Sequence, residues 1–220
     1  MRHIGQRGST ARHVGLIVDG VRRWARTREV PLVDAYATAM ERVRAFIDFF
    51  FTNESECLSV YLLSTDNLRR LPNELNPVLH AETILVSEGL PPVLRRWGCK
   101  VRHAGDISVL PDSFAAPLLD LTRIPAGNGR VLNLLIAYNP WDEMSAAARA
   151  NTDLQSGLWV PEPVDMVIRT SGEKRLSGFL PLQCAYAELF FSRKSVNDLT
   201  ASDFRRALRW YRGRQRRFGA

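Results

Sequence analysis

Cysteine and lysine are scarce in this 220-residue sequence, and long apolar runs are absent. The three cysteines, Cys57, Cys99 and Cys184, lie far apart and form no C-x-x-C pair, which argues against a disulfide framework and against a zinc site. No apolar run is long enough to span a bilayer, and the first residues lack the apolar stretch of a signal peptide. We therefore expect a cytoplasmic protein without stable membrane insertion.

Several well-known catalytic motifs are also missing from the chain. There is no Walker loop, no G-x-G-x-x-G segment and no serine nucleophile elbow. The four histidines show no spacing typical of metal ligands. These absences argue against a P-loop nucleotide enzyme, a Rossmann-type dinucleotide enzyme and an α/β-hydrolase.

The positive charge of the chain is carried almost entirely by arginine. The formal net charge is +7, and Lys100, Lys174 and Lys194 are the only lysines. The planar guanidinium group of arginine grips phosphate oxygens in pairs, although a GC-rich genome would produce the same bias. Charge alone leaves nucleic acid, an anionic membrane surface and small anionic substrates open as partners.

Apolar periodicity predicts strands that alternate with helices. A short apolar run favours a buried strand, and spacings of three and four residues favour a helix. Strands are expected at residues 13–18, 58–63, 100–104, 131–137 and 164–168. Helices are expected from about residue 33, from 77 to 97 with a break at Pro91-Pro92, and from about residue 202 after a capping box of Thr200 with Asp203. This alternation predicts a single α/β domain at residues 13–220, with a central, mainly parallel sheet flanked by helices, after a flexible segment at residues 1–12.

Polar groups follow three of the expected strands. Ligands collect beyond the carboxyl ends of parallel strands, and these ends carry Asp19-Gly20, the segment 64–67 and the segment 169–172. A carboxylate followed by glycine and by Arg22-Arg23 is a plausible corner for a hard cation and a phosphate. The alternative is a solvated Asp-Gly turn of the kind common at strand ends.

Two further segments carry candidate chemistry. In the segment 169–177 two arginines flank a turn of small residues and a serine follows, a composition that can wrap a diphosphate or form an exposed basic loop. Glu188 has apolar neighbours, and a carboxylate in such a place needs a cation or an ion-pair partner. A structural salt bridge to one of the arginines is the alternative for Glu188.

Taken together, these segments resemble the cis-prenyltransferase family, that of undecaprenyl diphosphate synthase. The strongest stretch, residues 165–188, is similar to the family's D-L-x-I-R-T-x-G-E-x-R-x-S-x-F-L…Q-x-A-Y-x-E. Residues 13–25 resemble H-x-x-x-I-M-D-G-N-x-R-W-A, residues 61–70 resemble Y-x-F-S-x-E-N-W-x-R, and residues 216–219 match R-R-F-G. The motifs occur in the family's order along nearly the whole chain. The resemblance implies a homodimeric enzyme with a parallel sheet flanked by helices.

The resemblance also implies roles for individual residues. Asp19 would bind Mg²⁺ and assist departure of the allylic diphosphate, and Glu188 would complete the metal environment across the dimer. The positions around the allylic diphosphate would be Gly20, Val21, Arg22, Arg23, Trp24 and Tyr36, and further substrate-binding positions would be Leu62, in the hydrophobic tunnel, and Arg70. The second diphosphate would be held by Arg169, Arg175 and Ser177, and the tail residues Arg217 and Gly219 would reach the partner's site. Asn67 and the hydroxyls of Ser64 and Thr65 would face the reacting carbons, with Asn67, Asp66 or a bound diphosphate oxygen as the group that moves the proton.

The sequence departs from the family pattern mainly at the allylic site. Val21 stands where the family has asparagine, Leu32 where it commonly has arginine, and Tyr36 where it has histidine. Asp66 replaces glutamate and Leu68 replaces tryptophan. The second diphosphate site keeps the family's residues, so the departures reshape the site where the allylic cation forms.

We therefore expect an enzyme that joins two dimethylallyl diphosphates head-to-middle, with or without subsequent ring closure, and that also takes geranyl diphosphate as a candidate substrate. Leu62, where long-chain members prefer a small residue, and Pro91-Pro92 predict a short product. Two alternatives stay open: a regular head-to-tail synthase that uses isopentenyl diphosphate, and a non-catalytic relative or basic nucleic-acid-binding protein. The retained Asp19, Arg169 and Arg175 favour an enzyme, and no nucleic-acid-reading module is recognisable.

Overall fold

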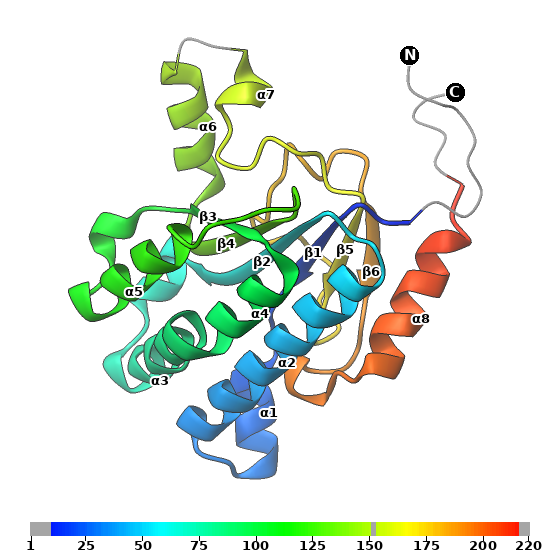
Figure 1. Cartoon of the computed structure of the whole chain (residues 1–220). Coiled ribbons are helices and arrows are strands. Elements are labelled where there is room, and N and C mark those ends of the chain that lie inside the picture. The colour runs from blue at the N-terminus through cyan, green and yellow to red at the C-terminus, as the bar shows by residue number, and fades with distance from the viewer. Residues whose placement is uncertain (1–9, 151–152, 216–220) are drawn as a thin grey trace.

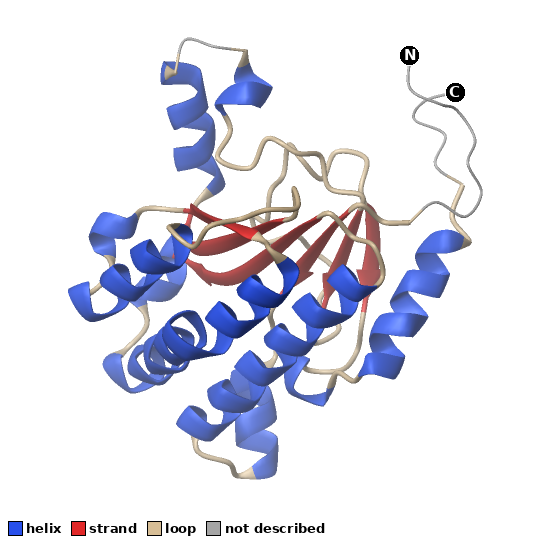
Figure 2. Ribbon diagram, viewed as in Figure 1, coloured by secondary structure: helices blue, strands red, loops and turns tan. Residues whose placement is uncertain are grey.

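A six-stranded parallel sheet forms the centre of the molecule (Figure 2). The computed structural model describes residues 10–150 and 153–215. The sheet has the strand order β3-β4-β2-β1-β5-β6, and every neighbouring pair is parallel. Its strands are β1 (His13–Ile17), β2 (Cys57–Ser64), β3 (Lys100–Ala104), β4 (Val131–Tyr138), β5 (Met166–Arg169) and β6 (Glu188–Phe191). The predicted fold class, a single α/β domain with a parallel sheet, is confirmed.

Most of the helices cover one face of the sheet (Figure 1). The helices are α1 (Val21–Arg28), α2 (Leu32–Thr52), α3 (Pro72–Ile84), α4 (Leu90–Trp97), α5 (Asp112–Thr122), α6 (Pro140–Arg149), α7 (Leu154–Gly157) and α8 (Ala201–Arg212). Apolar side chains from α1 to α5 and from α8 pack against β1, β2 and β4 in one large core. Burial of this core, which excludes water from apolar area, is the main force that holds the helical layer on the sheet.

The opposite face of the sheet is covered mainly by irregular chain. Val160, Phe179 and Leu180 lie between α7 and β6, and they form a second core with Tyr61 and Tyr138 of the sheet. The Phe179 ring sits so close to β1 that a Cβ at Gly15 would lie 2.5 Å from it. Glycine is required at that position of the strand because any side chain there would displace the ring.

The expected break in the helical stretch 77–97 occurs at a different place. The helix starts earlier, at Pro72, and its break is the π-helical turn Leu85–Gly89, which ends just before Pro91-Pro92. The two prolines sit in the first turn of α4, where no intrahelical acceptor is needed for their missing N–H groups. The expectation of a break was right, and its position at the prolines themselves was wrong.

Other elements differ from the sequence expectations in smaller ways. The capping box of Thr200 and Asp203 is present at the start of α8, as predicted. The sequence did not predict β6, nor the helices α1, α5, α6 and α7. Of the segment predicted to be flexible, residues 1–9 lie outside the described residues, while Ala11 is buried and its carbonyl accepts a hydrogen bond from Ser55.

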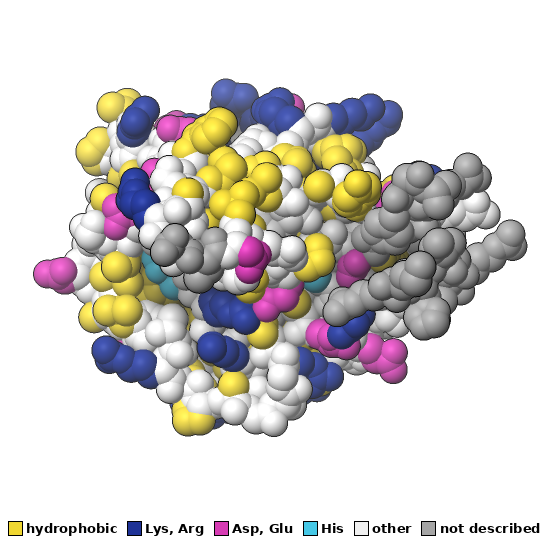
Figure 3. Space-filling view, turned by 90° about the horizontal axis from the view of Figure 1, so that it is seen from above, with side chains coloured by type: hydrophobic (Ala, Val, Ile, Leu, Met, Phe, Trp, Pro, Cys, Tyr) yellow, Lys and Arg dark blue, Asp and Glu magenta, His cyan; other side chains and the backbone are white. Residues whose placement is uncertain are grey.

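Charged side chains are mixed on the face shown in Figure 3. In that view lysine and arginine side chains lie scattered among acidic and apolar ones, without one continuous basic stripe over the described residues. A clustered basic stripe is the usual electrostatic footprint of a nucleic-acid-binding surface. Within residues 10–150 and 153–215, no helix is long and apolar enough to cross a membrane.

Candidate active site

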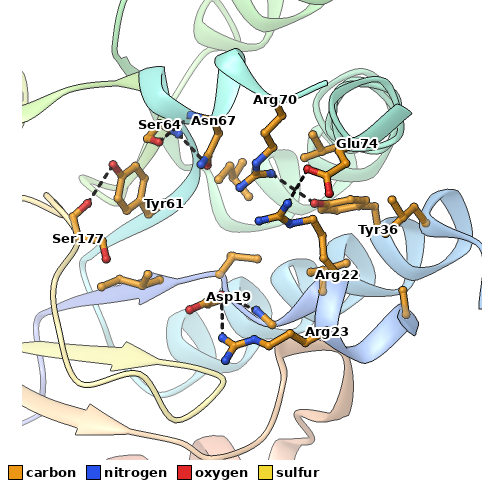
Figure 4. Close-up of a pocket in the computed structure, with 18 of the residues that line it drawn as sticks. Asp19, Arg22, Arg23, Tyr36, Tyr61, Ser64, Asn67, Arg70, Glu74 and Ser177 are labelled. Atoms are coloured by element: carbon orange, nitrogen blue, oxygen red, sulfur yellow. Dashed lines mark hydrogen bonds and ion pairs between the residues drawn. The ribbon is translucent and has the colours of Figure 1, made fainter. Parts of the chain in front are cut away.

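A pocket of about 760 Å³ opens beyond the carboxyl ends of β1, β2 and β5 (Figure 4). Six arginines and four carboxyl side chains line it, together with a group of apolar residues. The charged residues are Asp19, Arg22, Arg23, Arg26, Arg70, Glu74, Glu82, Arg169, Glu173 and Arg175. The apolar residues include Val21, Leu32, Met40, Leu62 and Val78. The pocket therefore combines a highly charged wall with an apolar one.

The carboxylate of Asp19 lies where β1 leads into α1. Its Oδ2 accepts a hydrogen bond from Arg169 Nη2 at 3.0 Å, and its Oδ1 accepts one from the Gly20 backbone amide at 2.7 Å. Burial by itself would raise the pKa of Asp19, but hydrogen bonds from Arg169, from Ser171 and from Gly20 outweigh it and lower the pKa. Asp19 is thus an anion at neutral pH, with part of its side chain open to the pocket.

Gly20 allows this sharp entry into α1. Its backbone has a φ of 99°, in the left-handed region that glycine adopts without strain, and an added Cβ would lie 2.8 Å from the Ser171 Cβ. The backbone N–H of Asp19 donates a hydrogen bond to the Thr170 hydroxyl at 2.8 Å, and that hydroxyl donates in turn to the Asp19 carbonyl oxygen at 2.7 Å. The adjacent strands β1 and β5 are therefore tied together at their ends.

The guanidinium group of Arg169 is buried at the end of β5. Besides its bond to Asp19, it donates to Ser177 Oγ at 2.8 Å and to the carbonyl of Arg175. Its Nε is buried and has no hydrogen-bond acceptor among the described residues. Arg169 also lines the pocket, so its guanidinium group places positive charge at the wall where an anion would bind.

A second group of charges joins α1 to the loop after β5. Glu173 accepts hydrogen bonds from Arg23 at 2.9 Å and from Arg175 at 2.6 Å. Arg23 also donates to the hydroxyl of Ser171 at 2.5 Å and lies 3.5 Å from Asp19. Hydrogen bonds from Arg23, with the charge of Arg175 next in effect, lower the pKa of Glu173. These exposed contacts position two arginines at the mouth of the pocket.

A third group lies on the facing wall, between α1, α2 and α3. Arg22 donates to Glu74 at 2.5 Å, and Arg70 donates to the hydroxyl of Tyr36 at 3.4 Å (Figure 4). Burial raises the pKa of Tyr36, so its hydroxyl is neutral at physiological pH. Tyr36 therefore places a neutral hydroxyl in the wall, directly against a guanidinium.

Polar residues after β2 bind mainly to one another. Ser64 and Asn67 form a capping box, in which the Asn67 amide donates to Ser64 Oγ at 3.2 Å and the Ser64 amide donates to Asn67 Oδ1 at 3.3 Å. Both residues line the pocket, and so does Tyr61, whose hydroxyl donates to the Ser177 carbonyl at 3.4 Å. These two bonds use the backbone N–H and Oδ1 of Asn67, so its side-chain N–H₂ group is not engaged in the capping box.

The structure does not bring every predicted site residue to this pocket. The Trp24 indole donates instead to Asp198 at 2.9 Å, and the Thr65 hydroxyl accepts from Asn139 at 3.4 Å. The Asp66 side chain points to solvent, 82% exposed, and pairs with Arg69. In a 3-10 turn the side chains at positions i and i+3 lie on the same side. Ser64 and Asn67 therefore face the pocket together, while the side chains of Thr65 and Asp66 point elsewhere.

Three predicted residues were expected to act across a dimer interface, which the structure of a single chain does not contain. Glu188 lies on β6 outside the pocket, where it accepts a hydrogen bond from Arg214 at 2.8 Å. Arg217 and Gly219 lie outside the described residues. The predicted roles of these residues across a dimer stay predictions.

Sequence reasoning missed three carboxyl groups that line the pocket. Glu74 and Glu173 each pair with an arginine that had been predicted as a site residue. Glu82 also lines the pocket, and neither of its carboxyl oxygens has a hydrogen-bond partner in the part of the chain that the structure describes. The buried position of Glu82 could have been recognised from the sequence. Val78 and Val86 lie one helical turn before and after it, and they mark the buried face of a helix.

The donor set at Asp19 suits a hard divalent cation. Among the described residues no group of three or more histidine, cysteine or acidic side chains gathers as a ready-made metal site. Mg²⁺ is commonly held by one or two carboxylates, with substrate phosphates and water in its remaining positions. The ionised Asp19, open to the pocket beside Arg23 and Arg169, fits that kind of binding.

A pocket with an arginine-rich wall and an apolar wall defines a class of enzyme whose substrates have an anionic head and an apolar tail. The family model described as putative undecaprenyl diphosphate synthase matches residues 17–219. The chain therefore belongs to the cis-prenyltransferase family, and it is a prenyltransferase that acts on prenyl diphosphates.

Known proteins similar to this chain include synthases of both short and long products. A (2Z,6E)-farnesyl diphosphate synthase of Mycolicibacterium smegmatis is 33% identical over 100% of this chain and 92% of its own length. A ditrans,polycis-undecaprenyl-diphosphate synthase of Xanthomonas axonopodis pv. citri is 34% identical over 94% of this chain and 88% of its own. The crystal structure of lavandulyl diphosphate synthase from Lavandula x intermedia, in complex with dimethylallyl diphosphate, is 25% identical with a TM-score of 0.85, covering 96% of this chain and 99% of that one.

Proposed function

We propose that this prenyltransferase is a magnesium-dependent synthase of a short, branched prenyl diphosphate, which it makes by joining two molecules of dimethylallyl diphosphate head-to-middle. The observation that carries the proposal is the composition of the pocket wall. Val21, Leu32 and Tyr36 line the pocket at positions where the resemblance leads one to expect asparagine, arginine and histidine. The wall near the first diphosphate is thus less polar than in a regular family member.

The other half of the pocket supports binding of a second diphosphate. Arg169, Arg175 and Ser177 line it together, and two of the three carry a guanidinium group. Guanidinium groups hold phosphate oxygens by charge-assisted hydrogen bonds, which are stronger than neutral ones. A second molecule of dimethylallyl diphosphate would occupy this half, with its double bond facing the first molecule.

The reaction would follow from the charges around the first diphosphate. The bond between C1 and the diphosphate oxygen would break, and Arg22 and Arg23 would stabilise the negative charge that develops on the leaving oxygens. C2 of the second molecule attacks C1 of the first, and the positive charge then formed at C3 is removed by loss of a proton from an adjacent carbon. Ring closure would require that a proton be added to the remaining double bond, that the new terminal double bond attack the tertiary cation formed there, and that a second proton loss end the reaction.

Asp19 is the residue we assign to the metal ion. A magnesium ion bound there would supply positive charge to the leaving diphosphate. Arg169 holds the Asp19 carboxylate in place at 3.0 Å, and the lowered pKa keeps this carboxylate ionised and able to bind a cation. The remaining ligands would be phosphate oxygens and water.

A regular short-chain synthase that uses isopentenyl diphosphate is the second candidate. The similarity to the (2Z,6E)-farnesyl diphosphate synthase of Mycolicibacterium smegmatis favours this candidate. Lavandulyl diphosphate synthase has the same fold with a TM-score of 0.85, and its structure contains dimethylallyl diphosphate, which supports the irregular reaction. Both candidates require the same retained residues, so the products must decide between them.

We further propose that the enzyme acts as a homodimer, in which Glu188, Arg217 and Gly219 contribute to the partner's site. The proposal rests on the resemblance of residues 216–219 to the family's tail and on the position of β6 at the edge of the sheet. Light scattering of the purified protein measures the molar mass directly. A mass of one chain at assay concentrations would rule out this arrangement.

The deciding experiment is incubation with dimethylallyl diphosphate and Mg²⁺ alone, followed by phosphatase treatment and gas chromatography of the alcohols. A branched or cyclic ten-carbon alcohol supports the proposal. A parallel incubation that also contains isopentenyl diphosphate serves as the control for regular coupling. Strict dependence on isopentenyl diphosphate, with a linear product, refutes head-to-middle coupling, and absence of turnover with every allylic diphosphate refutes the assigned synthase activity.

A further inference from the structure

A segment in the connection between β6 and α8, residues 192–198, lies next to the active-site pocket without lining it. We call it the back segment; in Figure 1 it belongs to the orange chain near the lower end of α8. It contains the 3-10 turn Val196–Asp198 and contacts three elements that do line the pocket, namely the end of β1, α1 and α2. The back segment can therefore set how these three elements lie relative to one another.

The first contact of the back segment is with the corner where β1 leads into α1. The backbone amide of Val196 donates to the carbonyl of Asp19 at 3.2 Å. Ser195 packs against Gly20 so closely that a Cβ at Gly20 would lie 2.9 Å from the Ser195 hydroxyl oxygen. The backbone of Asp19 and Gly20 thus rests directly on the back segment, while the Asp19 carboxylate opens to the pocket on the other side.

The second contact holds the helix that carries two of the pocket arginines. One carboxylate oxygen of Asp198 accepts hydrogen bonds from the Trp24 indole at 2.9 Å and from the Arg28 guanidinium at 3.1 Å. Both donors belong to α1, which also carries Arg22 and Arg23. The position of α1 against the back segment is therefore fixed by a charged acceptor with two donors.

The third contact is made by Asn197, a buried amide that is only 3% exposed. Its Nδ2 donates to the Ala35 carbonyl at 2.7 Å, and its Oδ1 accepts a hydrogen bond from the Ser195 hydroxyl at 3.0 Å. Ala35 immediately precedes Tyr36 in the first turn of α2. Asn197 therefore connects the wall that carries Tyr36 with Ser195, the residue that packs against Gly20.

The stability of α2 alone does not require the bond from Asn197. The Ala35 carbonyl lies inside the helix, where the amide of Ala39, four residues later, is its regular partner. The additional bond from Asn197 fixes the place at which α2 begins relative to the rest of the fold. That place matters for the pocket, because Tyr36 lines it and its hydroxyl accepts a hydrogen bond from Arg70 at 3.4 Å.

We propose that Asn197 is a positioning residue of the synthase reaction, which fixes the spacing between the Tyr36 wall and the corner at Asp19 and Gly20 without touching substrate. The proposal rests on the proposed synthase function. The diphosphate that leaves in the first step lies between these two parts of the pocket. A change in their spacing misaligns the groups that stabilise the leaving oxygens, and misalignment of this kind lowers the rate of the chemical step.

The test measures kcat for diphosphate release from dimethylallyl diphosphate with Mg²⁺, together with the Tm of each variant. Asn197→Ala should lower kcat by about tenfold. Asn53→Ala is the matched control, because the Asn53 Nδ2 also donates to a carbonyl of α2, that of Phe49 at 2.8 Å, but at the far end of the helix, about 25 Å along its axis from Tyr36. Both variants lose a side-chain bond to α2 and should have a lower Tm, whereas only Asn197→Ala should have a lower kcat.

A double-mutant cycle separates positioning from a general loss of stability. Tyr36→Phe removes the hydroxyl that contacts Arg70, and with it the contact that depends on where α2 begins. The loss of kcat caused by Asn197→Ala should therefore shrink from about tenfold in the wild-type background to about threefold or less in the Tyr36→Phe background. A residue that contributes only stability would cause the same loss in both backgrounds, measured at a temperature at which all four proteins are folded.

The outcomes distinguish this inference from the proposed function. If the wild-type protein turns over but Asn197→Ala keeps its kcat, or loses the same factor in both backgrounds or as much as Asn53→Ala, the positioning role is refuted and the synthase function stands. If the wild-type protein releases no diphosphate from any allylic diphosphate, the synthase function is refuted and this inference with it. Should Asn197→Ala fail to fold, Ser195→Ala takes its place in the cycle, because it removes the bond to Asn197 Oδ1 and leaves the bond to Ala35.

Discussion

An Asp19→Asn substitution would keep the shape of the side chain at the end of β1 and remove its charge. The structure gives this carboxylate two tasks, a structural pairing with Arg169 at 3.0 Å and an open position in the pocket for a cation. The substitution should therefore lower both stability and rate, but by very different factors. Measuring both on the same variant separates the two tasks.

The stability cost follows from the contact with Arg169. A hydrogen bond to a charged partner contributes about 1.5–3 kcal/mol, and the 28% exposure of the Asp19 side chain reduces this to about 1–2 kcal/mol. For a chain of this size that cost corresponds to a Tm lower by about 2–8 °C. Thermal unfolding followed by circular dichroism measures it, and the variant should remain folded at 25 °C.

The pH dependence of this cost has a defined sign. The folded chain lowers the pKa of Asp19, so its stabilising effect is present above the unfolded value of about 3.9 and is lost as the pH falls through the folded pKa. The difference in Tm between wild type and Asp19→Asn should be constant from pH 5 to pH 8 and should shrink below about pH 4. A difference that instead grows in acid would contradict the assignment of an ionised Asp19.

The effect on rate should be much larger. Loss of one preorganised group that stabilises developing charge costs about 10²–10³ in kcat. Diphosphate release from dimethylallyl diphosphate, measured with the wild type, Asp19→Asn and EDTA-treated wild type, gives the comparison. If Asp19→Asn kept more than half of the wild-type rate, or if EDTA left the wild-type rate unchanged, the assignment of Asp19 to a catalytic metal ion would be wrong.

Two further predictions concern the tail-binding wall and the core. Leu62→Ala removes a buried side chain from the pocket wall, which should lengthen the pocket and shift the products toward longer chains. Chromatography of the dephosphorylated products measures this shift. An unchanged product would mean that Leu62 does not limit the length of the tail. Burial lowers the pKa of His13, so as the pH falls below about 6.5 the unfolded chain takes up a proton before the folded one and stability declines. His13→Gln should reduce that decline by up to about 1.4 kcal/mol per pH unit in urea titrations, and an equal slope in both proteins would exclude a contribution from His13.

The fold could be predicted from the sequence to a large extent because its central strands are short apolar runs. All five predicted strands are present, with ends that differ by two residues or fewer. The strand β6 could not be predicted in this way, since Glu188 interrupts its apolar pattern and each of its residues is only half-buried at the sheet edge. The position of the π-helical turn Leu85–Gly89 was also out of reach, because the backbone adjusts before the prolines rather than at them.

The charged part of the site could be predicted for a related reason. Parallel strands place their carboxyl ends at one edge of the sheet, so residues that follow different strands gather there. Ile17 pairs with Arg169 across β1 and β5, and this register brings the Asp19 carboxylate onto the Arg169 guanidinium. The sequence shows that each strand is followed by polar groups, but it does not show which strands are neighbours. The pairing of Asp19 with Arg169 is therefore information that only the sheet order supplies.

The apolar end of the pocket shows the limit of sequence reasoning more clearly. A glutamate on the buried face of a helix can be recognised from the period of Val78 and Val86, and the usual expectation is that an arginine from another element pairs with it. That expectation depends on tertiary geometry, and here the geometry differs: Arg70 is directed to Tyr36 at 3.4 Å and leaves both oxygens of Glu82 unpaired. Tyr36 occupies the place where the family resemblance leads one to expect histidine. Its hydroxyl accepts the hydrogen bond from Arg70, so this residue affects whether Arg70 is available to Glu82. The contact between Arg70 and Tyr36 thus depends on a residue that the family resemblance does not lead one to expect, and Tyr36→His should be tested for its effect on rate.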